Sequence, residues 1–227
     1  MPDALTVIRA RYRLPDFTSA VAIPYHPSRW PYEITRRGFR SDLARLFRDL
    51  GYTRGAEIGV WQGEFSACLL AHNPALHLTL VDPWVAYSDY RDHTRPDLIA
   101  TAYQQTLDRL AEPITAGRVT VLRKFSTEAA ADVPDRSLDF VYLDGNHSLW
   151  HVINDLTLWS KKVKPGGIIA GHDYIRLENR IALSFHVVEA VDAFTRANEI
   201  QPWFVLGQRV YERRKRDRER SYFWVQP

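Results

Sequence analysis

The sequence contains little that would cross-link the chain or hold it in a membrane. Cys68 is the single cysteine among the 227 residues, so the chain cannot form an internal disulfide bond. The apolar neighbours of Cys68 predict that it packs in the core. No run of about 18 apolar residues is present to cross a bilayer, and the first residues carry charges where a signal peptide needs an apolar stretch. We therefore expect a cytoplasmic protein that does not span a membrane.

Lysine is also scarce, because the chain has five lysines against 25 arginines and a net charge of only +3 at pH 7. The densest cationic stretch, residues 209–220, has Glu212, Asp217 and Glu219 between its basic residues. Charges of both signs between two apolar runs are more typical of a solvated hairpin loop than of a nucleic-acid site. The stretch therefore predicts no nucleic-acid partner, and an RNA-binding role stays a minor alternative.

The composition, with 45% apolar and 25% charged residues, suits one folded domain over residues 1–227. Residues 1–40 are rich in Pro, Tyr and Arg and show no clear period. We expect them to be irregular, either lying over the mouth of a site or contacting a second copy in a homodimer. Residues 41–227 carry the regular patterns and form the core of the domain.

Strand-like apolar runs alternate with helical patterns along the core. The runs occur at residues 56–60, 78–81, 119–122, 138–143 and 168–170, and helical spacing is clear at residues 41–51, 147–163 and 186–198. This alternation predicts a parallel sheet wrapped by helices on both faces. Two final runs, residues 203–206 and 221–225, have no apolar helix between them and predict an antiparallel hairpin. The predicted fold class is an α/β, Rossmann-like sheet of seven strands, five parallel and two in the hairpin.

A glycine turn follows the first predicted strand, in the segment GAEIGVWQGEFS. Gly59 and Gly63 stand between a strand and a helix, where missing side chains let a ligand approach the backbone. Asp82 ends the next strand and could accept two hydrogen bonds from a ribose diol. The glycine spacing matches neither the three-glycine dinucleotide fingerprint nor a phosphate-binding loop.

Five motifs in order carry a resemblance to a known family. They are EIGVxxG from residue 57, VDPW from 81, FSxEAA from 125, VYLDGNHS from 141 and KPGGIIAGHDY from 164. Together they resemble the class I S-adenosylmethionine-dependent methyltransferases, and within these the bacterial methyltransferase family 24. The resemblance implies that Glu57, Gly59, Trp61 and Gly63 border the methionine part of the cofactor, that Asp82 holds the ribose, and that Trp84 and Ser126 lie near the adenine. Turn glycines and a core tryptophan remain the simpler alternatives for some of these residues.

Two aspartates, Asp144 and Asp173, each follow an apolar run that predicts a buried parallel strand. A carboxylate is costly inside such a strand, so both belong at the strand ends, where ligands bind in open α/β sheets. The resemblance implies that Asp144, Asp173 and residue 172 hold a divalent metal, magnesium or manganese, and that Asp144 also borders the cofactor. The residue at 172 is a histidine, which departs from the family's oxygen ligand. Imidazole suits manganese, iron or zinc better than magnesium, so either the metal differs or His172 lies outside the ligand set.

His147 is the predicted general base. It stands three residues after Asp144 at the start of a helix, and its ordinary pKa of about 6.5 lies near working pH. A metal cation and the positive end of a helix should keep the ring neutral, as a base must be. We expect Asn146 and Ser148, beside it, to cap the helix.

From these residues we expect an S-adenosylmethionine-dependent O-methyltransferase that methylates a hydroxyl of a sugar, glycoside or polysaccharide precursor with metal assistance, with residues 41–227 as its catalytic core. A neighbouring hydroxyl on a sugar would chelate the metal well. One alternative is a metal-dependent hydroxylase-like enzyme on the same fold. The other is an RNA-binding or RNA-modifying protein that uses the arginine-rich residues 209–220.

Overall fold

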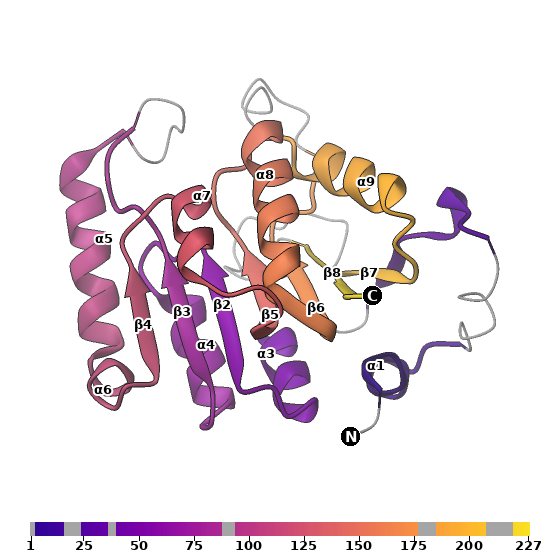
Figure 1. Cartoon of the computed structure of the whole chain (residues 1–227), viewed down its shortest axis with the longest axis horizontal. Helices are drawn as coiled ribbons and strands as arrows, with labels where there is room; N and C mark the ends of the chain where they lie inside the picture. Colours follow the sequence, from indigo (N-terminus) through magenta and orange to yellow (C-terminus); the bar gives the residue numbers. More distant parts are fainter. Residues whose placement is uncertain (1–2, 16–23, 36–39, 88–93, 177–184, 208–219) are drawn as a thin grey trace.

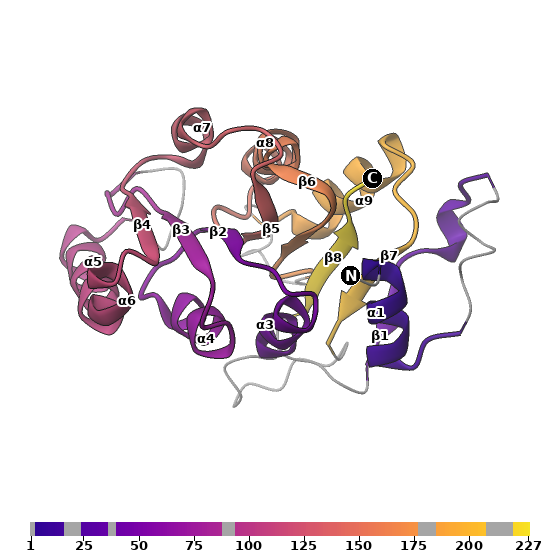
Figure 2. The same cartoon turned by 60° about the horizontal axis from the view of Figure 1, so that its bottom comes forward.

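The computed structural model describes residues 3–15, 24–35, 40–87, 94–176, 185–207 and 220–227. Within this part, one sheet lies between two layers of helices (Figures 1 and 2). The arginine-rich stretch that was predicted to be a loop lies outside the described residues, except for Arg220.

The sheet has eight strands in the described part of the chain. They are β1 (Tyr32–Ile34), β2 (Arg54–Ile58), β3 (His77–Val81), β4 (Val119–Leu122), β5 (Leu138–Leu143), β6 (Val163–Gly171), β7 (Trp203–Leu206) and β8 (Ser221–Val225). Their order in space is β1-β7-β8-β6-β5-β2-β3-β4. Strands β2 to β6 pair in parallel, which confirms the five parallel strands predicted from the apolar runs.

The last two strands form the predicted antiparallel pair, with Phe204 opposite Phe223. Strand β8 also pairs antiparallel with β6, where Ala170 lies opposite Phe223. The final strand of the chain therefore lies inside the sheet, between β6 and β7.

The prediction of seven strands was wrong because β1 adds an eighth. Strand β1 pairs in parallel with β7, with Tyr32 opposite Phe204. Only three residues long, it gives no visible alternation in the sequence. The prediction that residues 1–40 are irregular was also wrong, since they contain helix α1 (Ala4–Tyr12) as well, with Asp3 as its N-cap. Of the described part of this segment, only Arg40 lines the cavity described below.

Helices cover both faces of the sheet, as predicted (Figure 2). One layer holds α1, α3 (Arg40–Asp49), α4 (Glu64–His72) and α5 (Pro96–Arg109), with the short α6 (Ala111–Thr115) after α5; the other holds α7 (Ser126–Ala129), α8 (Leu149–Trp159) and α9 (Val187–Ala197). Short 3-10 turns occupy Pro27–Arg29, Ala130–Asp132 and Ser160–Lys162. None of the described helices combines the length and apolar character needed to span a bilayer.

The central strand β5 shows how the sequence fixes the two cores. All six of its residues are buried, and the last four alternate between the layers. Phe140 and Tyr142 join the core under α3 and α4, while Val141 and Leu143 join the core under α8 and α9. Phe140 stacks on Phe47 of α3 with 4.1 Å between ring centroids, and burying one such side chain contributes about 1.5–3 kcal/mol. This packing holds the carboxyl end of β5, where Asp144 follows, in a fixed place.

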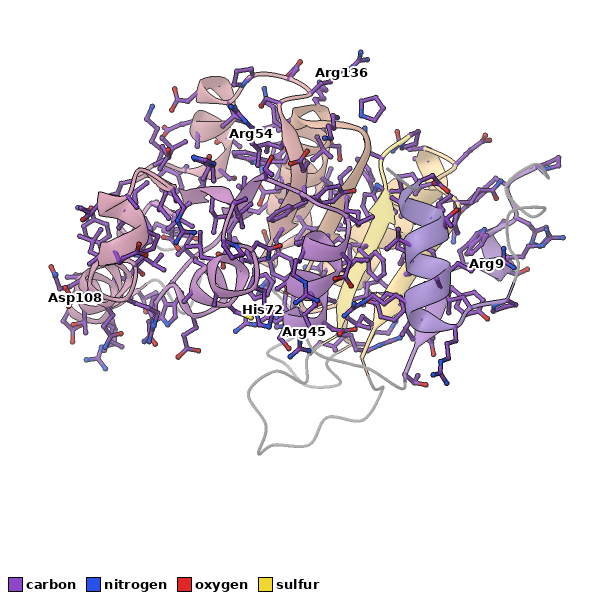
Figure 3. All side chains as sticks on the ribbon, turned by 90° about the horizontal axis from the view of Figure 1, so that it is seen from below. Arg9, Arg45, Arg54, His72, Asp108 and Arg136 are labelled. Atoms are coloured by element: carbon purple, nitrogen blue, oxygen red, sulfur yellow. The ribbon has the colours of Figure 1, made fainter. Side chains whose placement is uncertain are left out.

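Many charged side chains that were not assigned to the site lie at the periphery. Figure 3 shows Arg45, Asp108 and Arg136 on the outside of the molecule, and all three are exposed. Glu57, Asp82 and His172 are buried instead, at the carboxyl ends of the parallel strands.

Candidate functional site

A cavity of about 650 Å³ opens at the carboxyl ends of β2, β3, β4 and β5. This volume is within the range of pockets that bind small molecules and cofactors. Six of the predicted cofactor residues line it, namely Glu57, Gly59, Trp61, Asp82, Ser126 and Asp144. Gly63 and Trp84 do not line it.

The glycine turn has a different physical basis from the one predicted. Gly59 has a φ of +85°, and a β-carbon there would lie 2.1 Å from the carbonyl oxygen of Asp144. Gly63 is the N-cap of α4, and a β-carbon there would lie 3.1 Å from Thr106 Cγ2 of α5. The space left by the missing side chains is therefore filled by the protein itself, although Gly59 still borders the cavity.

Asp82 holds the glycine turn. Its Oδ2 accepts hydrogen bonds from the backbone N–H groups of Val60 and Trp61, both at 3.0 Å, and its Oδ1 accepts one from Trp84 N at 2.8 Å. The carboxylate is buried but lines the cavity. Oδ2 thus already accepts two hydrogen bonds, and at most one further bond, on Oδ1, is left for a ligand hydroxyl.

Trp84 and Ser126, predicted to lie near the adenine, differ in their placement. The Trp84 ring is 1% exposed in the core beneath α5, and its Nε1 donates to the carbonyl of Trp61 at 2.9 Å. This placement favours a packing role for Trp84 over contact with the adenine. Ser126 begins α7, lines the cavity and donates a short hydrogen bond to Asp155 Oδ1.

Glu57 is a buried acid at the floor of the cavity. It is the next-to-last residue of β2, just before Ile58. Its Oε2 accepts a hydrogen bond from the hydroxyl of Ser66 on α4. Burial raises the pKa of Glu57 to about 8, against the opposing effects of the Ser66 hydrogen bond and the Arg40 charge. At neutral pH the side chain is therefore largely the neutral acid.

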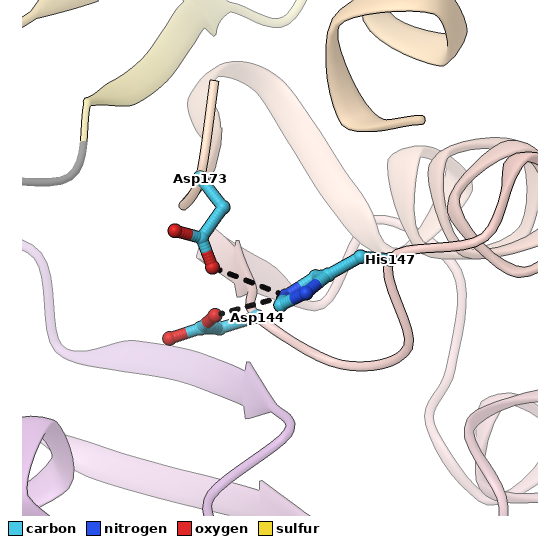
Figure 4. Close-up of side chains that lie close together, drawn as sticks. All are labelled: Asp144, His147 and Asp173. Atoms are coloured by element: carbon cyan, nitrogen blue, oxygen red, sulfur yellow. Dashed lines mark ion pairs between the residues drawn. The ribbon is translucent and has the colours of Figure 1, made fainter. Parts of the chain in front are cut away.

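The second half of the site is a cluster of two aspartates and two histidines. Asp144 follows β5 and Asp173 follows β6, and Figure 4 shows the His147 ring turned toward both carboxylates. His147 Nε2 lies 3.7 Å from Asp144 Oδ1 and 3.2 Å from Asp173 Oδ2. His172 Nδ1 lies 3.6 Å and 3.3 Å from the same two oxygens. The structure thus brings together the predicted base and all three predicted metal ligands.

The backbone at Asp173 supports this arrangement. Its φ is +56°, in the left-handed region that few residues other than glycine adopt. Strained backbone of this kind costs about 1–3 kcal/mol and occurs often at functional sites. The conformation lies where the chain leaves β6 and where Asp173 Oδ2 meets both imidazoles.

The charges of the cluster are strongly coupled. Burial alone would raise the pKa of Asp144, but His172 and His147 outweigh it and hold that pKa well below its usual range. Burial alone would lower the pKa of His172, but Asp144 and Asp173 raise it to about 10. They likewise raise the pKa of His147 above its ordinary value. Without a bound cation the carboxylates favour protonated imidazoles, contrary to the neutral His147 predicted; a cation between the carboxylates would compete with those protons.

Three cavity residues escaped the sequence analysis. His151 and Asp155 lie four residues apart on one face of α8, and both line the cavity together with His147 from the loop before this helix. The pattern HSLWHVIND contains this signal. Burial raises the pKa of Asp155 to about 7, opposed by its hydrogen bond from Ser126. Arg40, the third, has its Nη1 3.4 Å from Asp144 Oδ2 and carried no sequence signal.

The capping predicted for Asn146 and Ser148 is found only in part, because Ser148 occupies the N-cap position of α8 but its side chain makes no capping hydrogen bond. The backbone N–H of Ser148 donates to Asn146 Oδ1 at 2.9 Å, which shapes the turn before α8. The Ser148 hydroxyl contacts His151 Nδ1 at 2.7 Å and so orients that ring.

Known proteins share this fold, and a family model matches part of the sequence. Residues 56–174 match the model of methyltransferase family 24, described as a methyltransferase domain. The O-methyltransferase TomG of Streptomyces achromogenes, involved in tomaymycin synthesis and solved in complex with S-adenosylmethionine, has a TM-score of 0.58 at 15% identity, covering 100% of this chain and 91% of that one. An O-methyltransferase family protein from Burkholderia thailandensis has a TM-score of 0.56 at 13% identity, covering 82% of this chain and 55% of that one. At these identities the likeness concerns the fold.

One curated protein is also similar in sequence. The uncharacterized protein y4gI of Sinorhizobium fredii is 38% identical over 53 residues, which make up 23% of this chain and 6% of that protein. The chain therefore spans only a small part of that relative's length.

Proposed function

The chain belongs to methyltransferase family 24, the S-adenosylmethionine-dependent methyltransferases whose model it matches over residues 56–174, and we propose that it methylates a hydroxyl group of a sugar, glycoside or polysaccharide precursor. One observation carries the proposal. A single cavity runs from the glycine turn and Asp82 to Asp144 and His147. A cofactor bound at the turn and an acceptor bound at the aspartates would therefore share one space.

The reaction is an in-line displacement at the methyl carbon. The bond from that carbon to the sulfonium sulfur breaks as the bond to the acceptor oxygen forms, and the acceptor hydroxyl loses its proton. The protein must therefore align the acceptor and take up the proton. Asp82 and the turn that it fastens are proposed to hold the ribose end of the cofactor, and Glu57 borders the same cavity.

His147 is proposed to take the proton. It lies on the cavity side of the cluster and begins the loop into α8. Its nitrogen needs to be unprotonated at that moment, and the carboxylates alone work against this. A divalent cation shared by Asp144 and Asp173 would remove the negative charge that favours the protonated ring.

The donor set fits such a cation, because His172 Nδ1 lies 3.6 Å and 3.3 Å from carboxylate oxygens of Asp144 and Asp173, and ligand atoms of these two aspartates and His147 all lie within 4.8 Å of one another. Asp144, Asp173 and His172 are the proposed ligands, for magnesium or manganese. The bound ion would lower the pKa of the acceptor hydroxyl and hold a neighbouring hydroxyl as a template. Tyr87 and Phe125 line the cavity with ring centroids 5.5 Å apart, and such aromatic surfaces suit the apolar faces of sugar rings.

A second function, metal-dependent hydroxylation, is favoured by one observation. Two imidazoles approach the same carboxylate pair, and two histidines with a carboxylate are the ligand types of non-haem iron oxygenases. The RNA-binding alternative has no such support. Of its arginine-rich stretch only Arg220 is described, and that side chain pairs with Glu33 at 2.9 Å.

The test is a methyl-transfer assay with labelled S-adenosylmethionine. Glycosides carrying neighbouring hydroxyls should be methylated, and matched deoxy-glycosides lacking one of the two should react more slowly. Catechols serve as a second diol class. If the protein binds S-adenosylhomocysteine yet methylates only catechols, the sugar assignment is wrong. Failure to bind the cofactor at all would overturn the proposed activity.

A further inference from the structure

Two carboxylate oxygens organise the cluster beside the cavity. Asp144 Oδ1 and Asp173 Oδ2 each lie between 3.2 and 3.7 Å from both His147 Nε2 and His172 Nδ1. Two oxygen and two nitrogen atoms therefore surround one point. Such a mixed set differs from the all-oxygen sets that magnesium prefers.

The two histidines take different positions around this point. His147 lines the 650 Å³ cavity, whereas His172 does not. His172 directly follows β6 and is only 7% exposed. Its ring packs against Tyr142, with 6.3 Å between ring centroids. His172 is thus fixed behind the carboxylates, while His147 stands between them and the space for an acceptor.

The ring of His172 has one nitrogen directed at polar groups. Nδ1 faces the two aspartates, and Nε2 has no hydrogen-bond partner among the described residues. A buried imidazole is costly unless its polar atoms have partners. Nδ1 is therefore the atom that a cation between the carboxylates would bind, and Nε2 would then carry the ring proton.

We propose that His172 binds a metal ion through Nδ1, and that the site therefore takes manganese, iron, cobalt or zinc in preference to magnesium. This inference rests on the metal-assisted part of the proposed function. Imidazole nitrogen binds first-row transition metals well, whereas magnesium requires near-ideal octahedral oxygen coordination and gives up its water reluctantly. His147, on the cavity side, stays available for the acceptor proton.

The competing arrangement uses the same atoms without a metal. A protonated His172 would form an ion pair with Asp144 and Asp173 and neutralise part of their charge. In that case the cluster would be an internal salt-bridge network, and no divalent ion would bind with a nitrogen ligand. The two arrangements make opposite predictions for metal binding, whether or not the protein transfers methyl groups.

Metal binding can be measured on the whole chain after exhaustive dialysis against a chelator. Calorimetry with Mg²⁺, Mn²⁺ and Co²⁺ should give at least about 10-fold tighter binding for the two transition metals. Loss of even an outer-shell partner commonly changes metal affinity by about 10–100-fold, so His172→Ala should weaken Co²⁺ binding by more than about 10-fold. The visible absorption of bound Co²⁺, which reports its ligands, should change in the variant.

His172→Glu is the more specific test, because it replaces a nitrogen ligand with an oxygen ligand. The ratio of the Co²⁺ affinity to the Mg²⁺ affinity should therefore decrease in this variant. His151→Ala is the matched control, since His151 lines the cavity but contacts Ser148 rather than the aspartates. Calorimetry with S-adenosylhomocysteine on the same samples reports folding and the cofactor half of the site separately. Wild-type protein that binds Mg²⁺ as tightly as Co²⁺, or a His172→Ala variant with unchanged Co²⁺ affinity and spectrum, would overturn the inference.

Discussion

Gly59 and Asp144 are in direct contact across the ends of β2 and β5, so that a β-carbon on Gly59 would lie 2.1 Å from the Asp144 carbonyl oxygen. The glycine turn therefore packs directly against the strand end that carries Asp144. A side chain added at Gly59 must displace the backbone of Asp144, or the turn itself must move.

Gly59→Ala should therefore destabilise the fold by more than the conformational strain alone. The matched control is Gly117→Ala, because Gly117 also has a positive φ, +71°, but a β-carbon there meets nothing within 4 Å. We expect about 1–2 kcal/mol of destabilisation for the control. Chemical denaturation measures both values. Equal losses in the two variants would contradict the contact with Asp144.

Asp82→Ala should weaken S-adenosylhomocysteine binding by about 1–3 kcal/mol, because it removes a buried acceptor from the turn and from the proposed ribose site. Asp139→Ala is the matched control. Asp139 also accepts hydrogen bonds from backbone N–H groups, Thr53 at 2.6 Å and Arg54 at 2.8 Å, at the opposite end of β2. The control should lose stability but keep its cofactor affinity. A folded Asp82→Ala variant with wild-type affinity in calorimetry would refute the ribose assignment.

His147→Ala should lower kcat by about 10²–10⁴-fold, the usual loss when a general base is removed, with little change in cofactor affinity. His72→Ala serves as the control, since His72 lies in α4 and contacts the Cys68 carbonyl at 2.9 Å, away from the cavity. Steady-state kinetics with a saturating acceptor measure the effect. Near-normal turnover without His147 would mean that another group takes the proton.

Removal of divalent metal should abolish turnover and leave cofactor binding intact, because the proposed ligands Asp144 and Asp173 lie beyond the glycine turn. Adding back a divalent ion should restore the rate. The same cofactor titration before and after chelation separates the two halves of the site. Full activity after exhaustive chelation would leave only acid and base roles for the aspartates.

Glu57 makes stability depend on pH in a definite direction. Burial raises the pKa of Glu57 from 4.5 to about 8, so between these values the folded state binds more protons than the unfolded state. The free energy of unfolding therefore decreases as pH rises through this window, by up to about 1.4 kcal/mol per pH unit. Glu57→Gln removes that slope, so its stability relative to wild type should increase from pH 5 to pH 8.

Urea denaturation at several pH values measures the slope. Asp108→Asn, a change at an exposed acid of α5, is the control and should follow the wild-type curve. Parallel curves for Glu57→Gln and wild type would show that Glu57 ionises normally in the folded protein.

The sequence predicted the strands best where apolar runs are buried on both faces. The run at residues 138–143 is β5, whose six residues are all buried. It predicted the convergence of Asp144 and Asp173 because parallel strands end at one edge of the sheet. Strand β1 was not predicted, because its three residues pair with β7, which lies far along the chain. A local pattern of apolar residues cannot indicate such a distant pairing.

Side-chain roles within the site were harder to predict than their positions. Gly59 suggested space for a ligand, but the neighbouring β5 end fills that space. Trp84 resembled an adenine contact, yet its ring is directed into the core. In both cases the deciding neighbour belongs to another segment of the chain. Arg40 was missed for the same reason, since only the fold brings it to Asp144.

The place of β8 between β6 and β7 has a consequence for the order of folding. Strand β1 pairs with β7, and β7 is joined to the rest of the sheet through β8, so this edge depends on pairings between segments that lie far apart in the sequence. Contacts between such distant segments form slowly, because the entropy of closing a long loop is lost before the contacts stabilise the chain. That edge of the sheet, including the strand that flanks β6 and hence Asp173, is therefore expected to form late in folding.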